Sequence, residues 1–275
     1  MKRSLLALAL ATMATSSFAY DAQMDGGFTY FDIDQEDVKN AGQFDVKGTF
    51  YFEPVQTKNG PLNEAAFLGN NSNVYGEYNY HYTNGKTYHL ADGEYSFDDE
   101  IFNLSAGVEY FYNQFYANAQ LGYAQNKYEI TEADEKSKDD YDITTYRALV
   151  GFLPMSNLLL AVGVDGYQGD ENNDEANFAV KAKYVTSIGQ NGQYLNFEAD
   201  ATFGDLDQVT LGTDYYFNQA FSLGAAYTLQ DDNEDDIDFF SVRSKYFINQ
   251  NLAIGAEVGF GDDVQGIHVN TTVRF

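Results

Sequence analysis

The 275-residue chain contains no cysteine and no tryptophan, only three prolines, and few basic residues. The absence of cysteine excludes a disulfide framework, and it also excludes thiolate metal ligands and thiolate nucleophiles. Fifteen lysines and arginines stand against 42 acidic residues, which gives a formal net charge of −27. A chain this acidic repels a phosphate backbone, so we expect no nucleic-acid partner.

Long hydrophobic runs are also missing. After the N-terminus, no window approaches the roughly 18 apolar residues of a membrane-spanning helix. The N-terminus has the features of a secretory signal, because Lys2 and Arg3 precede the apolar run 5–14 and Ser17-Phe18-Ala19 offers small residues for cleavage. The competing interpretation is a short core helix. We expect residues 1–19 to be a cleaved signal peptide and residues 20–275 to form one exported domain.

The chain is rich in tyrosine (23), phenylalanine (22) and glycine (24). Apolar residues alternate with small or polar ones along most of its length, and this period of two indicates β-strands with two different faces. We expect 14 strands, at residues 24–33, 42–53, 73–83, 100–112, 114–129, 140–153, 157–168, 176–188, 192–204, 207–217, 220–230, 237–248, 250–260 and 264–275. Twelve or sixteen strands remain open, since segment 84–99 is either a long extracellular loop, such as a hairpin, or two further strands.

The two faces differ in chemistry. Apart from positions near one end of some segments, one parity carries no charge, as in Phe44, Val46 and Phe50. A soluble β-sandwich would bury that face in a core, whereas a membrane barrel would turn it towards lipid. In a barrel the other parity lines the lumen, and its candidate pore-lining residues are Lys47, Glu77, Glu109, Arg147, Lys181, Lys183, Glu198, Asp200, Asp214, Arg243, Lys245 and Glu257.

The connections favour the membrane barrel. The same short turn, aromatic residues followed by Asn-Gln, occurs at Asn113, Asn218 and Asn249, and tight connections alternate with longer acidic ones. Short turns at one end and longer loops at the other are typical of a transmembrane antiparallel up-and-down β-barrel of the outer membrane. The rings beside each turn then form an aromatic girdle at the periplasmic boundary.

The C-terminus ends on an alternating apolar stretch that resembles the signal by which outer-membrane barrels are recognised for assembly. Its lipid-facing residues are Val269, Thr271, Val273 and Phe275. We therefore expect the barrel-assembly machinery to be a partner, together with outer-membrane lipid and lipopolysaccharide.

A barrel of about 14 strands is wider than side chains fill, so its polar lining indicates water inside. Opposed rows of lumen bases and acids would set a transverse field across a constriction, whereas pairs across neighbouring strands would only stiffen the wall. We expect mild cation preference or little selectivity. Residues 54–72 form the one long periplasmic connection, with a helical turn at 64–68 expected along the rim and plugging of the lumen as the alternative.

The segment 51–78 carries a family resemblance. A strand ends there in an aromatic-Pro-Val unit, and Gly-Pro-Leu and Glu-Ala-Ala-Phe-Leu follow before the next strand. This pattern is similar to one in the general bacterial porin family of gammaproteobacteria, and the whole mature chain resembles a porin. The resemblance implies a water-filled channel in the outer membrane of a Gram-negative bacterium, through which ions and small hydrophilic solutes diffuse passively.

Two other function classes remain open. A structural or adhesive outer-membrane barrel would meet a partner with its acidic loops and keep its lumen closed. An enzyme is disfavoured, because His81, His89 and His268 show no spacing typical of a catalytic set. We expect no cofactor and no metal site, since the acidic run 231–236 lacks the glycine turn and distal glutamate of an EF-hand. The oligomeric state, monomer or trimer, is left open.

Overall fold

A computed structural model describes residues 19–57, 60–91, 93–133, 135–169, 174–189, 192–204, 207–231 and 236–275. The expected signal peptide lies outside these residues except for Ala19, and so do positions 232–235 of the acidic run. The elements are β1 (Ala19–Ile33), β2 (Val38–Gln56), η2 (Leu62–Glu64), α2 (Ala65–Leu68), β3 (Asn73–Gly85), β4 (Tyr88–Leu90), β5 (Gly93–Tyr112), β6 (Phe115–Glu132), β7 (Glu135–Met155), β8 (Leu158–Gly169), β9 (Asp174–Ile188), β10 (Gln193–Phe203), β11 (Asp207–Tyr216), β12 (Phe221–Asp231), β13 (Asp236–Asn249), β14 (Leu252–Phe260) and β15 (Val264–Arg274). Among the described residues, no helix has the length and apolar character to cross a bilayer.

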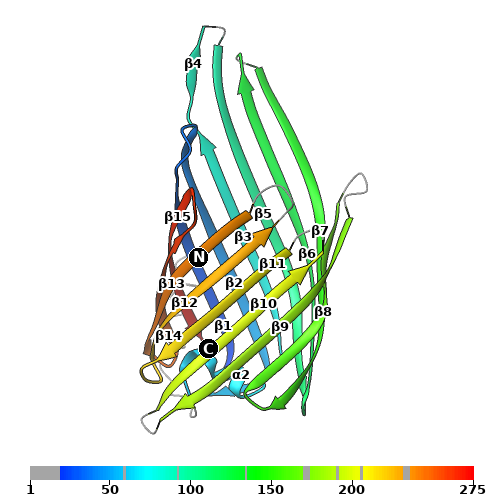
Figure 1. Ribbon diagram of the computed structural model, residues 1–275, viewed down its shortest axis with the longest axis vertical. Helices are drawn as coiled ribbons and strands as arrows, with labels where there is room; N and C mark the ends of the chain where they lie inside the picture. The colour runs from blue at the N-terminus through cyan, green and yellow to red at the C-terminus, as the bar shows by residue number, and fades with distance from the viewer. Residues whose placement is uncertain are drawn as a thin grey trace, which may run out of the picture.

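The strands form one closed antiparallel barrel. Each strand pairs with its neighbours in sequence, β1 pairs with β15, and the pairing of β3 with β5 completes the ring (Figure 1). The three-residue strand β4 pairs with β5 alone and lies outside the ring. Fourteen strands therefore build the barrel, which confirms the expected fold class and strand number.

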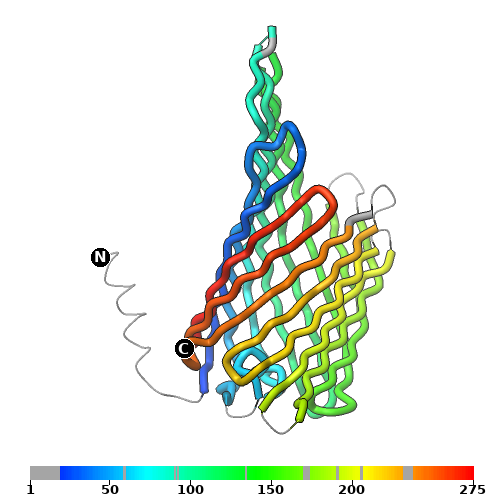
Figure 2. The backbone as a smooth tube through the Cα atoms, turned by 60° about the vertical axis from the view of Figure 1, so that its left-hand side comes forward, coloured from blue at the N-terminus to red at the C-terminus, as the bar shows by residue number. Residues whose placement is uncertain are grey.

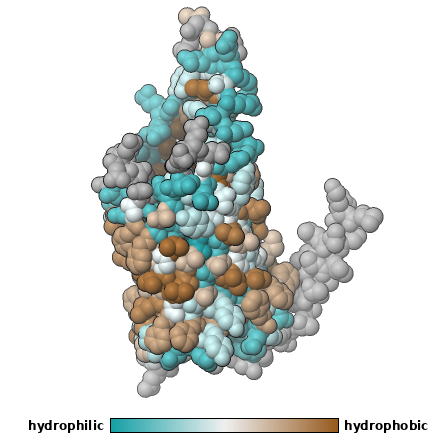
Figure 3. Space-filling view, turned by 90° about the vertical axis from the view of Figure 1, so that its right-hand side faces the viewer, coloured by the Kyte–Doolittle hydropathy of each residue, from teal (hydrophilic) through white to brown (hydrophobic). Residues whose placement is uncertain are grey.

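The alternation of the sequence becomes the two faces of the wall. The apolar parity points outwards, where Phe50, Leu104 and Ile267 keep 56%, 56% and 57% of their surface exposed. Polar residues of the other parity, such as Asn196 and Thr272, are buried inside. Figure 3 shows the outward apolar side chains gathered in the lower part of the molecule, with hydrophilic ones above. A barrel with this pattern hides its polar groups from hydrocarbon.

The chain closes on itself at the seam between β1 and β15. Met24 lies opposite Val273 in the register, and the backbone N–H of Phe275 donates to Ala22 O at 2.9 Å. Val269 and Phe275 are exposed on the outer wall, as expected for the terminal apolar stretch. Their part in assembly stays a prediction.

One end of the barrel, here called the turn end, carries the three Asn-Gln turns. Asn113 adopts a left-handed φ of 54°, a conformation that asparagine tolerates. The side-chain oxygen of Asn218 accepts the N–H groups of Ala220 and Phe221, which ties the turn locally. Phe217 and Phe221 stack beside it with ring centroids 5.2 Å apart. The crowding of rings at these turns is confirmed.

The opposite end rises unevenly. Strands β5, β6 and β7 have 20, 18 and 21 residues, whereas β10, β11 and β14 have 11, 10 and 9. The long strands exceed the short ones by 7 to 12 residues (18 − 11 to 21 − 9), which at about 3.3 Å per residue adds roughly 20–40 Å along the strands. We call residues 88–100 and 126–142 the ridge (Figures 1 and 2). Segment 84–99 is thus a hairpin extension and supplies no additional spanning strands.

Candidate functional site

The connection between β2 and β3 contains a short helical segment, residues 60–72, here called the inner segment. Gly60 has φ of 94°, a left-handed conformation that favours glycine. Pro61, at φ of −63°, then leads into η2, and the good helix formers of 65–68 continue as α2. The helical turn expected around residues 64–68 is therefore present.

Its expected place on the rim is wrong. Leu62 packs against Phe247 and Ala253, and its N–H donates to Gln219 O at 2.8 Å. In the strand order, the β11–β12 turn that holds Gln219 lies on the far side of the barrel from β2 and β3. The inner segment therefore crosses the lumen at the turn end, where Figure 2 shows it as a cyan coil. Apolar packing inside the barrel is what draws it inwards.

Glu64 anchors the far side of the inner segment. Its side chain is 1% exposed and forms an ion pair with Lys183 Nζ at 2.9 Å, while Tyr216 OH donates to its other oxygen at 2.5 Å. Lys183 also pairs with Glu198 at 2.9 Å and lies 5.3 Å from the centroid of the Phe67 ring. Burial of this carboxylate is tolerated because a cation pairs with one of its oxygens and a hydroxyl donates a hydrogen bond to the other.

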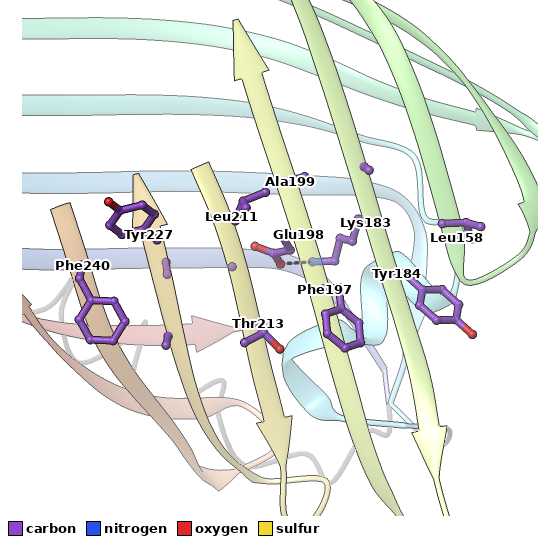
Figure 4. Close-up of a pocket in the computed structure, with 14 residues that line it drawn as sticks. Leu158, Lys183, Tyr184, Phe197, Glu198, Ala199, Leu211, Thr213, Tyr227 and Phe240 are labelled. Carbon is purple, nitrogen blue, oxygen red and sulfur yellow. Dashed lines mark hydrogen bonds and ion pairs between the residues drawn. The ribbon is translucent and has the colours of Figure 1, made fainter. Parts of the chain in front are cut away.

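The predicted lining residues all lie on the inner parity of their strands. Figure 4 shows that side chains alternate in direction along β9 and β10. Lys183 and Glu198 point towards each other, whereas the adjacent Tyr184 and Phe197 point away from this pair. The structure brings most of them together as ion pairs. These are Lys47–Glu77 (2.5 Å), Arg147–Asp165 (3.0 Å), Arg147–Asp200 (2.8 Å), Lys181–Glu109 (4.0 Å), Lys183–Glu198 (2.9 Å), Arg243–Asp214 (2.7 Å), Arg243–Glu198 (3.6 Å) and Lys245–Asp25 (3.7 Å). Glu257 lies opposite Arg243 in the register of β13 and β14.

Bases and acids are thus interleaved around the wall, and they are not separated into opposed rows. The pairs Lys47–Glu77 and Lys183–Glu198 join adjacent strands. Arg147 instead reaches from β7 to Asp200 on β10, past two intervening strands. Such longer bridges span part of the lumen and narrow it.

The inner residues that were not among the predicted lining include Asp25, Glu64 and Tyr216. Asp25 had a signal, because it follows outward-facing Met24 in the alternation of β1. Glu64 had none, since its position depends on partners 119 and 152 positions away in sequence.

The lumen keeps open space beside these residues. One cavity of about 410 Å³ is lined by the four lysines at 47, 181, 183 and 245 and by the inner segment. A second, of about 300 Å³, adjoins it and is lined by Asp214, Arg243, Glu257 and His268. Within the described residues, no group of three or more histidine, aspartate or glutamate side chains is arranged to hold a metal ion. The geometry provides a charged interior with open cavities, crossed at one end by the inner segment.

Comparison with solved structures places the fold among outer-membrane barrels. The outer membrane protein Omp33 of Acinetobacter baumannii is 23% identical, with 94% of this chain and 99% of that chain covered and a TM-score of 0.63. A FadL homologue of Pseudomonas aeruginosa is 10% identical over 94% of this chain and 90% of its own, with a TM-score of 0.60. The toluene transporter TodX of Pseudomonas putida is 10% identical over 96% and 90%, with a TM-score of 0.53. At these identities the likeness shows the fold alone.

Comparison of sequences identifies a family for this chain. No curated protein matches the chain. A family model described as "Putative general bacterial porin" matches residues 1–274. That match covers the strands, the inner segment and the ridge, and it agrees with a charged lumen inside an apolar wall. The chain therefore belongs to the putative general bacterial porin family.

Proposed function

We propose that this protein is a porin of the Gram-negative outer membrane, a water-filled channel for the passive diffusion of ions and small hydrophilic solutes. The observation that carries the proposal is the closed 14-strand wall, apolar outside and charged inside, which encloses open cavities. In this orientation the turn end is periplasmic and the ridge is extracellular. Lipid and lipopolysaccharide surround the wall, and the barrel-assembly machinery recognises the stretch ending at Phe275.

The inner segment gates the channel in this proposal. It occupies the periplasmic end of the lumen and is held by Glu64, Leu62 and Phe67. Solutes pass when these contacts release and the segment swings towards β2 and β3, to which it is covalently joined. With the segment docked, we expect a small conductance with short openings.

Selectivity for small ions is weak in this proposal. Most lumen charges are neutralised in pairs, which leaves little net field along the path. The acidic ridge concentrates cations at the outer mouth and favours them mildly, and salt reduces this effect because charges are screened beyond about 8 Å at 0.15 M.

The test is planar-bilayer recording on the refolded full-length mature protein. Discrete conductance steps, with a reversal potential close to zero or slightly towards potassium in a KCl gradient, would support the proposal. A protein that inserts in folded form yet carries no current, even after removal of the inner segment, would refute it.

A second candidate is a structural or adhesive outer-membrane barrel with a closed lumen. Two observations favour it: the inner segment crosses the lumen at the turn end, and the ridge extends far beyond the wall. A barrel that lacks the inner segment distinguishes the two candidates. A pore would then conduct strongly, whereas an adhesin would still bind its partner whether or not the barrel conducts.

A further inference from the structure

The cavity of about 410 Å³ beside the inner segment is rich in lysine, although the protein as a whole carries a net charge of −27. Four lysines and three carboxylates line it, and Lys47 and Lys183 also pair with Glu77 and Glu198 outside the lining. The lysines are Lys47, Lys181, Lys183 and Lys245, and the carboxylates are Asp25, Glu64 and Glu109. We call this cavity the lysine chamber.

The carboxylates of the lysine chamber already have hydrogen-bond donors. Gln23 Nε2 and Thr272 Oγ1 donate to Asp25 at 2.7 and 2.5 Å, and Tyr116 OH and Asn73 Nδ2 donate to Glu109 at 2.6 and 3.3 Å. Glu64 is held by Tyr216 and Lys183. A cation that enters the chamber thus meets oxygens whose lone pairs are partly used.

Two of the lysines are held more loosely. Lys181 Nζ lies 4.0 Å from Glu109 and Lys245 Nζ lies 3.7 Å from Asp25, and both distances exceed an ordinary hydrogen bond. These ammonium groups come from β9 and β13 and face the same cavity. They offer donors that an entering anion can use.

Arg274 adds a second cation near Asp25. Its guanidinium lies 4.3 Å from the ring centroid of Tyr20 and 4.5 Å from that of Phe247, and its side chain is almost fully buried. Both Arg274 and Lys245 interact electrostatically with Asp25, so one carboxylate serves two cations. Among the described residues, Nη1 of Arg274 has no hydrogen-bond partner.

We infer that the lysine chamber binds small solutes that bear a carboxylate, with the carboxylate held by Lys181 and Lys245. The inference rests on the proposed function and names a solute class for its pore. Binding must be weak enough for release, so a dissociation constant of about 1 mM is expected. The acidic ridge does not prevent entry at physiological salt, because its field is screened within about 8 Å.

Isothermal titration calorimetry on the refolded full-length mature protein in detergent tests this without requiring a current. Three probes share a four-carbon chain and differ only in charge: succinate, 1,4-butanediol and 1,4-diaminobutane. Succinate should bind at about millimolar strength while the diol and the diamine show no saturable heat. Absence of succinate binding, or stronger binding of the diamine, overturns the inference.

Variants locate the site. The pair Lys181→Gln and Lys245→Gln should weaken succinate binding roughly tenfold, because two charge-assisted hydrogen bonds are lost. The pair Lys181→Arg and Lys245→Arg should retain binding and shows that the substituted wall still folds. Lys136→Gln with Lys138→Gln on the ridge is the matched control and should leave binding unchanged. Equal binding in the glutamine pair and the control places succinate elsewhere and refutes the site.

The titration separates this inference from the proposed function. Conductance without succinate binding removes the lysine chamber as a solute site and leaves the pore intact. Succinate binding in a barrel that carries no current, with or without the inner segment, refutes the pore while the chamber remains a carboxylate site.

Discussion

The two ends of the barrel are built in opposite ways. At the turn end, apolar side chains pack inside the lumen, and Tyr20, Val55 and Leu62 are at most 6% exposed. At the other end, residues 135–142 of β7 are exposed on both faces and mostly charged or polar. Interior apolar packing is found where a segment has to be held inside a polar wall. The comparison teaches that the turn end is the packed part of the barrel, where the proposed pore would be gated, whereas the ridge is a solvated extension of the sheet.

Removal of the inner segment should have the largest effect. Replacing residues 60–71 with a short Gly-Ser linker takes away the only described chain that crosses the turn end, so single-channel conductance should rise on the order of tenfold. Planar-bilayer recording measures the change, and heat-modifiable migration on gels verifies folding. The matched control shortens the β4–β5 hairpin on the ridge and should alter conductance less than about twofold. Equal conductance in both variants would mean that the inner segment is no barrier.

A single anchoring charge should have the next largest effect. Glu64→Gln leaves Lys183 with Glu198 alone, so docking of the inner segment should weaken by about 2 kcal/mol, less than for an isolated buried pair. That corresponds to a rise of more than tenfold in the ratio of open to closed time, measured at fixed voltage. Tyr216→Phe removes one hydrogen bond from the same carboxylate and should have a smaller effect in the same direction. Longer closures in Glu64→Gln would contradict the anchoring role.

The sequence predicted the wall well and the interior of the turn end poorly, and the physical reason differs between the regions. An alternation of apolar and polar residues indicates a strand whose two faces meet different surroundings. The membrane-spanning parts of all 14 strands could therefore be recognised in the sequence. The inner segment has no such period, and its place depends on Lys183 and Tyr216, far away in the chain. A helical turn of small and apolar residues fits a rim as well as a lumen.

The ridge shows a related limit. The hairpin expected as one form of segment 84–99 is present, but residues 130–139 were predicted as part of a longer acidic connection, whereas β6 continues to Glu132 and β7 begins at Glu135. Outside the membrane both faces of a hairpin meet water, so strands persist without alternation. Prediction of the ion pairs has a similar limit. The parity of a charged residue indicates whether it faces the lumen, but its partner depends on the register and order of the strands, as for Arg147 and Asp200.

A charge in the lumen between the two ends should have an intermediate effect. Arg147→Gln leaves Asp165 and Asp200 without their shared cation, so the potassium-to-chloride permeability ratio should rise about twofold. Reversal potentials in a KCl gradient measure the ratio, and Arg147→Lys should restore most of it. A shift towards chloride would show that the permeating ions do not pass these carboxylates.

The ridge should respond least. Lys136 and Lys138 both pair with Glu129, but their side chains are 64% and 68% exposed, and ion pairs in water contribute little. Replacing both lysines with glutamine should leave the urea midpoint of unfolding of the refolded barrel nearly unchanged and should leave conductance unchanged. A large drop in the urea midpoint would mean that the ridge is held as firmly as the inner segment. The contrast between a packed turn end and a solvated ridge would then be wrong, because ion pairs exposed to water would stabilise the barrel as strongly as buried ones.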